Sequence, residues 1–173
     1  RAYDHIIHDV ALQSLPVVFA IDRAGLVGED GATHHGVFDF SYLSSIPGMT
    51  VASPRNEIYL RHLLYTAQLP SATGPFAIRY PRGSGEIEHW RQPMKELPVG
   101  RGEKITGGSD VAILSIGPIA SEASKAIAMA REKGISVAHY DMIFLKPIDT
   151  GILREVAESG MPIITLEDAS VKG

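Results

Sequence analysis

Cysteine is absent from the 173-residue chain, which excludes disulfide bonds and thiolate chemistry. A surplus of positive charge is absent as well: 16 Lys and Arg stand against 20 Asp and Glu, and no run of basic residues occurs. Proteins that bind a nucleic acid backbone or an anionic membrane surface carry such a surplus. The composition therefore argues against both as partners.

Long apolar segments are also missing. A membrane-spanning helix needs roughly 20 consecutive apolar residues, and no uninterrupted run approaches that length. The chain is 45% hydrophobic and 21% charged, which is ordinary for a globular protein. We therefore expect a folded, water-soluble protein.

Both ends of the chain have the pattern of an interrupted element. The chain opens on Arg1, at the start of an amphipathic helical pattern, rather than on an initiator Met. It closes on Val171, Lys172 and Gly173, just after an apolar strand that no helix follows. We expect an internal piece of a longer protein, truncated at both its N- and C-terminal ends.

Polar chemistry is concentrated between residues 22 and 39, which read DRAGLVGEDGATHHGVFD. This stretch holds four glycines, two adjacent histidines, an arginine and four acidic residues. The preceding run at 15–21, LPVVFAI, is apolar and rich in β-branched residues, as is typical of a buried parallel strand. Ligands of open α/β sheets bind outside the carboxyl ends of the strands. The pattern therefore predicts a ligand site in this loop.

The other elements of the first half follow from periodicity and breakers. They are a helix at about 2–13, a helical turn at 42–46, a strand at 49–53, a helix at about 54–69 and a strand at 75–83. Ser53 is predicted to cap the second helix, with Pro54 in its first turn.

The second half alternates strands and helices. Strands are expected at 110–117, 136–141 and 161–168, and helices at 118–133, before Gly134, and at 150–159, capped by Thr150. This order is typical of a parallel sheet with right-handed crossovers. The predicted fold class is α/β, with two open parallel-sheet units of three layers at residues 1–83 and 110–173, joined by a linker at 84–109 that is rich in Gly, Pro and charge.

Two arginines are candidates for binding an anion. Arg23 follows the strand at 15–21, and Arg82 lies on the exit of the strand at 75–83, so both can reach the same sheet edge. Guanidinium groups suit phosphate or carboxylate because they donate bidentately. The alternative is a structural ion pair of Arg23 with Asp22 or Asp39.

His34 and His35 lie near Asp30 in the same loop. Adjacent histidines diverge, and no third ligand arrives at zinc spacing, so a metal site is disfavoured and none is predicted. A histidine whose tautomer an acidic neighbour holds would suit acid–base chemistry. The alternative is a histidine that only bonds the backbone. A magnesium-diphosphate motif at residues 29–31 with Asn56 is rejected, because Glu29 stands where that motif has Gly.

The residues that carry a family resemblance are RAYDHIIHDVALQSLPVVFAIDRAGLVGEDGATHHGVFDFSYLSSIPGM, at the start of the chain, and RYPRG, at 79–83. They closely resemble the 1-deoxy-D-xylulose-5-phosphate synthases, a transketolase-like family that depends on thiamine diphosphate and Mg²⁺. The resemblance implies a pyrimidine-binding domain, a partial transketolase C-terminal-type domain, and a transferase that condenses pyruvate, with decarboxylation, and D-glyceraldehyde 3-phosphate. It places the enzyme in isoprenoid, thiamine and pyridoxal biosynthesis.

The resemblance also implies roles for single residues. Arg23 and Arg82 fall where the family binds the substrate phosphate, and Asp30 and His34 fall at catalytic positions; no role is carried to His35. Ligands of the cofactor and Mg²⁺ are expected outside this chain. The family implies a homodimer, in the bacterial cytoplasm or in a plastid. A β-type subunit of a 2-oxoacid dehydrogenase and a non-enzymatic assembly module remain alternatives.

Overall fold

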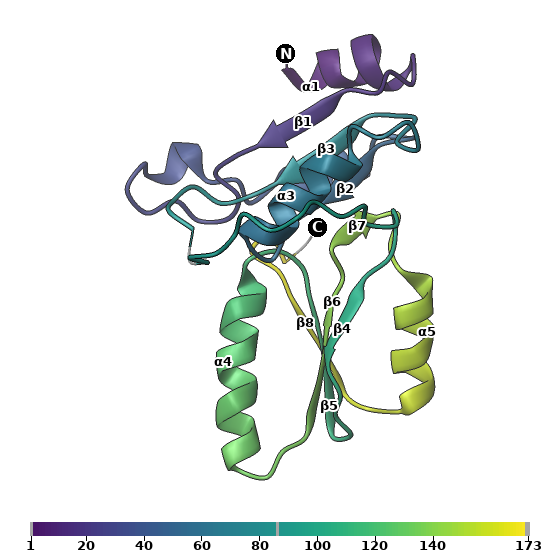
Figure 1. Ribbon diagram of the computed structural model, residues 1–173. Coiled ribbons are helices and arrows are strands. Elements are labelled where there is room, and N and C mark those ends of the chain that lie inside the picture. Colours follow the sequence, from purple (N-terminus) through teal and green to yellow (C-terminus); the bar gives the residue numbers. More distant parts are fainter. Residues whose placement is uncertain (1, 86, 172–173) are drawn as a thin grey trace.

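Two four-stranded sheets, one above the other in Figure 1, make up the computed structural model, which describes residues 2–85 and 87–171. The first sheet contains β1 (Val18–Ile21), β2 (Thr50–Ala52), β3 (Phe76–Arg79) and β7 (Phe144–Lys146). The second contains β4 (Glu103–Thr106), β5 (Val111–Ser115), β6 (Val137–Asp141) and β8 (Ile163–Leu166). The helices are α1 (Ala2–His5), continued by η1 (Ile6–Ala11), η2 (Ala32–His34), α2 (Asp39–Ser44), α3 (Glu57–Thr66), α4 (Ile119–Glu132) and α5 (Thr150–Ser159).

The first sheet has the strand order β1-β3-β2-β7. β1 and β2 both pair in parallel with β3, as the sequence predicted. β7 was not predicted, and it pairs antiparallel with β2, so the sheet is mixed. β7 has only three residues and follows β6 closely, so its apolar run merges with that of β6 in the sequence. The second half of the chain thus contributes a strand to the first sheet.

The second sheet has the order β4-β6-β5-β8. Its strands β5, β6 and β8 are parallel, and α4 and α5 cover opposite faces, which gives the predicted three layers (Figure 1). β4 lies inside the stretch assigned to a linker and pairs antiparallel with β6. Its four residues, EKIT, are partly exposed at the edge of the sheet, so they lack the apolar pattern of a central strand.

Alternating side chains divide the core into layers. Neighbouring residues Val51 and Ala52 are both fully buried, but they belong to different apolar clusters, because successive strand side chains point to opposite faces. The cluster beneath α3 contains Leu63, Phe76 and Ile78. The other runs from α2 through the first sheet into the second unit, where it includes Tyr140 of β6 and Val156 of α5. The two units therefore share one of the apolar clusters.

Two predicted helix caps were wrong. Ser53 does not cap α3; its hydroxyl donates to the carbonyl oxygen of Arg79 at 2.9 Å. Asn56 is the cap, because its side chain accepts from the backbone N–H of Tyr59 at 3.1 Å. Similarly, Asp149 rather than Thr150 caps α5. In both cases the capping side chain, Asn56 or Asp149, lies close to the residue assigned from the sequence. It occupies the position from which a side-chain oxygen can accept from the free N–H groups of the first turn.

Polar contacts also cross between the units. Arg55, just before α3, donates from Nη1 to Glu103 Oε2 at 2.8 Å and to Asp141 Oδ2 at 2.9 Å. The Asp141 side chain has no exposed surface. Burial raises the pKa of Asp141 to about 6, although Arg55 opposes that shift.

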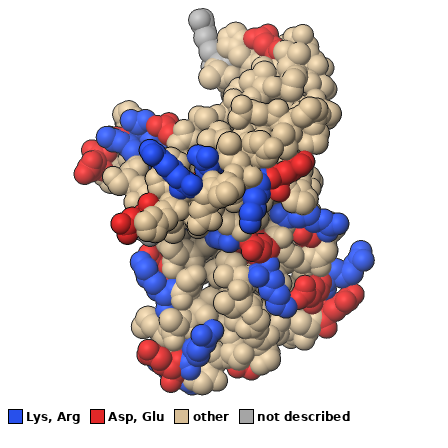
Figure 2. All heavy atoms as spheres, viewed as in Figure 1, with Lys and Arg blue, Asp and Glu red and all other residues tan. Residues whose placement is uncertain are grey.

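Charged side chains of both signs are interspersed over the middle and lower parts of the face shown in Figure 2, whereas the upper part is mostly uncharged. Within residues 2–85 and 87–171, no helix combines the length and apolarity that crossing a membrane requires.

Replacing Asp141 with Asn should change how stability depends on pH. A carboxyl whose pKa is raised on folding stabilises the protein below its unfolded pKa of 3.8, and that contribution is lost as the pH rises through the folded value of about 6. Asn stays neutral throughout. We expect the free energy of unfolding of the native protein, relative to D141N, to fall by about 2–3 kcal/mol between pH 4 and pH 7 in urea titrations. A difference that stayed constant with pH would contradict this expectation.

Candidate functional site

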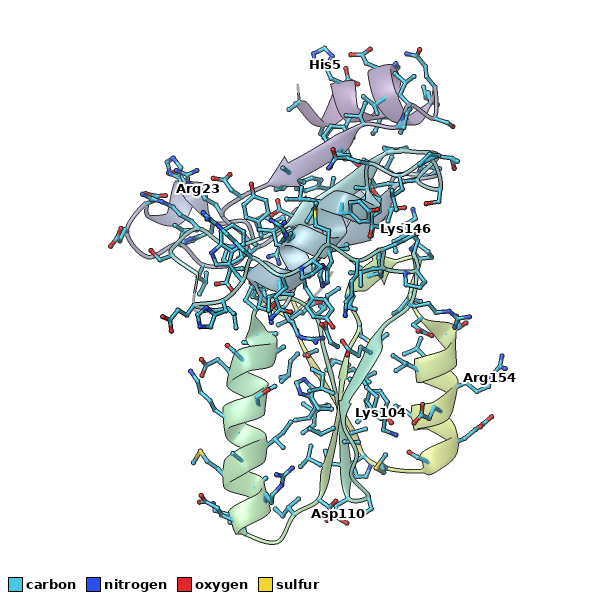
Figure 3. All side chains as sticks on the ribbon, in the orientation of Figure 1. His5, Arg23, Lys104, Asp110, Lys146 and Arg154 are labelled. Atoms are coloured by element: carbon cyan, nitrogen blue, oxygen red, sulfur yellow. The ribbon has the colours of Figure 1, made fainter. Side chains whose placement is uncertain are left out.

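The structure brings Arg23 and Arg82 to one edge of the first sheet. β1 and β3 are adjacent and parallel, with Ile21 opposite Arg79, so the segments that follow them leave the sheet side by side. Arg23 Nε donates to Asp30 Oδ2 at 2.8 Å, and Arg82 Nη1 donates to Asp30 Oδ1. Figure 3 shows Arg23 on the loop beyond β1. Two guanidinium groups therefore converge on one carboxylate.

Charge pairing keeps this cluster ionised. Hydrogen bonds from Arg82 and then Arg23 hold the pKa of Asp30 below its ordinary value. The pKa of Arg23 is raised by its bond to Asp30 and by the charge of Asp22. Arg23 Nη1 also contacts Asp22 Oδ2 at 2.8 Å, so one ion pair considered from the sequence is present. The side chains of Arg23 and Arg82 are 37% and 43% exposed, which leaves donors open to a ligand.

Two cavities meet at the segment Arg82–Ser84. One, of about 560 Å³, is lined by that segment and by residues 26–29 of the site loop. The other, of about 480 Å³, lies between the starts of α3 and α4. Arg82 thus borders open space on both sides, and a small anionic molecule could approach it through the first cavity.

The histidines are arranged differently from the acid–base prediction. The two carboxylate oxygens of Asp30 accept from the arginines, not from His34. His34 is exposed, and its Nδ1 lies 3.0 Å from Thr33 Oγ1. His35 Nδ1 accepts the backbone N–H of Val27 at 2.9 Å, which matches the backbone-bonding alternative. The partner of Asp30 could not be predicted from the sequence, because Arg82, which lies 52 positions further along the chain, donates to its carboxylate.

Arg79 is a site residue that the sequence analysis overlooked. It has no exposed surface, and it donates to the carbonyl oxygen of Gly36 at 2.7 Å. Its other partners are Asp39 and Asp168, and its guanidinium lies 4.3 Å from the ring centroid of Phe40. Asp39 therefore pairs with Arg79 and not with Arg23. The available signal was a charged residue inside an otherwise apolar strand, which requires buried partners.

The base of the loop is closed by backbone contacts. Gly25 and Gly36 exchange two hydrogen bonds, of 3.2 and 2.9 Å, and the N–H of Ala24 donates to Tyr80 at 3.0 Å. Arg23 has a left-handed φ of +61°, which is uncommon for a residue with a side chain. These contacts fix the direction in which Arg23 leaves the sheet.

A metal site is not evident in this part of the chain. Among the described residues, no three His, Cys, Asp or Glu side chains form a group that could hold a metal ion. The exposed guanidinium groups of Arg23 and Arg82 can donate to an anion, whereas both carboxylate oxygens of Asp30 already accept from these two arginines.

Two family models match the chain. "Transketolase, pyrimidine binding domain" matches residues 1–86, and "Transketolase, C-terminal domain" matches residues 100–173. Together they cover every strand of the two sheets and leave out residues 87–99.

Similar proteins agree with these models. The 1-deoxy-D-xylulose-5-phosphate synthases of Bacteroides thetaiotaomicron and Chlorobaculum tepidum are 58% and 50% identical over the whole chain, which spans 27% of the length of each. A solved structure titled "Split gene transketolase, inactive beta4 tetramer" has a TM-score of 0.86 and 30% identity, over 100% of this chain and 55% of its own. A Pichia stipitis transketolase, with a TM-score of 0.71 and 21% identity over 94% of this chain and 25% of its own, shares the fold.

Replacing Gly36 with Ala should disrupt the base of the loop. A Cβ at this position would lie 2.3 Å from the backbone oxygen of Arg23, which cannot move without breaking the closing contacts. Overpacking of this kind costs about 1–3 kcal/mol, and we expect a drop of roughly 3–10 °C in the thermal midpoint. Gly28→Ala is the matched control, because a Cβ there meets nothing within 4 Å. Equal midpoints for the two variants would refute the tight closure.

Proposed function

The chain belongs to the transketolase family, and from this premise we propose that it forms the substrate-phosphate-binding part of a 1-deoxy-D-xylulose-5-phosphate synthase. The reaction proposed for the whole enzyme is the decarboxylating condensation of pyruvate with D-glyceraldehyde 3-phosphate. The observation that carries the proposal is the convergence of Arg23 and Arg82 on Asp30 at the edge of the sheet.

A phosphate fits this arrangement because it offers several oxygens to two guanidinium groups. Each guanidinium can donate two parallel hydrogen bonds to an oxyanion. Asp30 already draws the two side chains toward one point, so little side-chain entropy remains to be lost when the phosphate arrives. In this proposal the arginines hold the phosphate end and thereby orient the aldehyde for attack.

His34 is proposed to act at the reacting end of the substrate. It is exposed on η2, and an imidazole can donate to an oxygen on which charge develops. Asp30 is proposed to keep the arginines oriented and to make polar contacts with the substrate. Neither role requires the His34–Asp30 pair expected from the sequence.

Thiamine diphosphate, when bound to the whole enzyme, supplies the electron sink for decarboxylation. The described residues of this chain offer no cluster for the Mg²⁺ that accompanies the diphosphate. We therefore propose that the ligands for the diphosphate and the metal come from the rest of the protein, since the chain spans 27% of the curated relatives. A homodimer in the bacterial cytoplasm is proposed by analogy with that family.

A β-type subunit of a 2-oxoacid dehydrogenase is the weaker alternative. The near relatives at 50–58% identity are synthases, and the second arginine, Arg82, has no evident purpose in an enzyme whose second substrate lacks a phosphate. The same pairing disfavours a non-enzymatic assembly module, which would need no exposed guanidinium groups converging beside a cavity.

Replacing Arg23 or Arg82 with Gln in the full-length enzyme should weaken binding of the phosphate. Loss of a charge-assisted hydrogen bond costs about 1.5–3 kcal/mol, so we expect the KM for D-glyceraldehyde 3-phosphate to rise roughly 10- to 100-fold. The KM for pyruvate should change less than about threefold. Steady-state kinetics with each substrate varied in turn would measure both constants.

Two controls sharpen this test. D-glyceraldehyde, which lacks the phosphate, should react equally well with the native enzyme and the variants. Arg154→Gln removes an arginine from the outer face of α5, which is remote from the site (Figure 3), and should change neither KM. An unchanged KM for the phosphorylated aldehyde in both site variants would overturn the proposed function.

The purified 173-residue chain should by itself show no turnover and negligible affinity for thiamine diphosphate. The physical reason is that the charged diphosphate binds proteins mainly through a metal ion, whose ligands we place elsewhere. Isothermal titration with the cofactor and Mg²⁺, together with a product assay, would measure both properties. Tight binding or product formation would place these ligands within this chain.

A further inference from the structure

The guanidinium of Arg79 is fully buried at the end of β3, directly beneath the site loop. Arg79 Nη1 donates to Asp168 Oδ1 at 2.5 Å and Nη2 donates to the Asp168 carbonyl oxygen at 3.3 Å. Asp39 Oδ2 lies 3.4 Å from Nε. A charge removed from water is tolerated only when it is paired and hydrogen-bonded, and Arg79 is held by two carboxylates and two backbone carbonyl oxygens.

The same contacts support the base of the loop. Arg79 holds the carbonyl of Gly36, and Gly36 is paired with Gly25. Asp168 also lies against Gly25, where an added Cβ would be 2.6 Å from Asp168 Oδ2. Gly25 is two residues from Arg23, so a shift of the Asp168 carboxylate displaces the segment that carries the phosphate-binding arginine.

Asp168 comes from the other unit of the fold. It follows β8, an edge strand of the second sheet, whereas the loop belongs to the first sheet. The segment that follows β8 therefore reaches across the junction to the base of the loop. Arg55 and Asp141 make a second ion pair across the same junction. Among the described residues, neither of them is hydrogen-bonded to the loop at residues 22–39.

We propose that Asp168 is a positioning residue for the substrate-phosphate site: through Arg79 and Gly25 it holds the base of loop 22–39 so that Arg23 faces Arg82. This inference rests on the proposed function, and it assigns to the second unit a part in recognising the phosphate. Asp168 does not touch the substrate; it acts through the backbone of the loop.

The test is Asp168→Asn in the full-length enzyme. Asn keeps the shape of the side chain but removes the charge, and Arg79 retains Asp39 as a partner. We expect the KM for D-glyceraldehyde 3-phosphate to rise about tenfold, while kcat and the KM for pyruvate change less than about twofold. Reactivity with D-glyceraldehyde should stay at the native level, since only the placement of the phosphate-binding arginine is altered.

Asp141→Asn is the matched control, because it removes a carboxylate from the other ion pair across the junction and Arg55 retains Glu103. It should leave the KM for the phosphorylated aldehyde unchanged. An equal rise in both variants would show a general loosening of the junction and overturn the inference. Folding of each variant is checked by circular dichroism, and Asp168→Ser, with the same expected result, replaces any D168N protein that does not fold.

The two proposals fail in different ways. If Arg23→Gln and Arg82→Gln raise the KM for D-glyceraldehyde 3-phosphate but D168N and D168S do not, the positioning role is refuted and the proposed function stands. If the arginine variants also leave this KM unchanged, the proposed function itself is refuted. Faster hydrogen exchange of the Gly25 and Gly36 amides in D168N is expected as a measurement independent of activity, because these amides close the loop.

Discussion

The buried guanidinium of Arg79 is the constraint on which the rest of the site depends. A fully desolvated cation must be surrounded by acceptors, and its acceptors come from the loop, from α2 and from the segment after β8. These segments lie far apart in the sequence, and satisfying one charge brings them together. The loop that carries Arg23 is consequently held at its base while its tip remains open to solvent.

Parallel pairing supplies the second requirement. β1 and β3 end at the same level, with Ile21 opposite Arg79, so the segments beyond them emerge together. Arg23 and Arg82 are 59 positions apart, but they converge on Asp30 because of this register. The carboxylate of Asp30 balances the two like charges and holds both guanidinium groups toward one point.

Many strands and helices of the fold could be predicted from the sequence, namely those for which a local pattern of residues is sufficient. The strands at 18–21 and 111–115 are dense in β-branched residues, and α4 ends before Gly134, whose φ is +79°. The strands β4 and β7 could not be predicted, because each is a short edge strand whose pairing depends on a partner elsewhere in the chain. The N-caps of α3 and α5 were assigned to the wrong residues for a different reason. Several polar residues lie near the start of each helix, and only the path of the backbone determines which of them reaches the free N–H groups.

The sequence by itself determined the fold class, the family resemblance and the residue types available at the site, since these follow from local periodicity and from the order of residues in the loop. Only the tertiary structure decided which charges are paired. It assigned Asp30 to two arginines instead of His34, left His35 with the backbone, and buried Arg79 against Asp168. The physical reason is that ion pairing depends on distance in space and on desolvation, and neither can be inferred from separation along the chain.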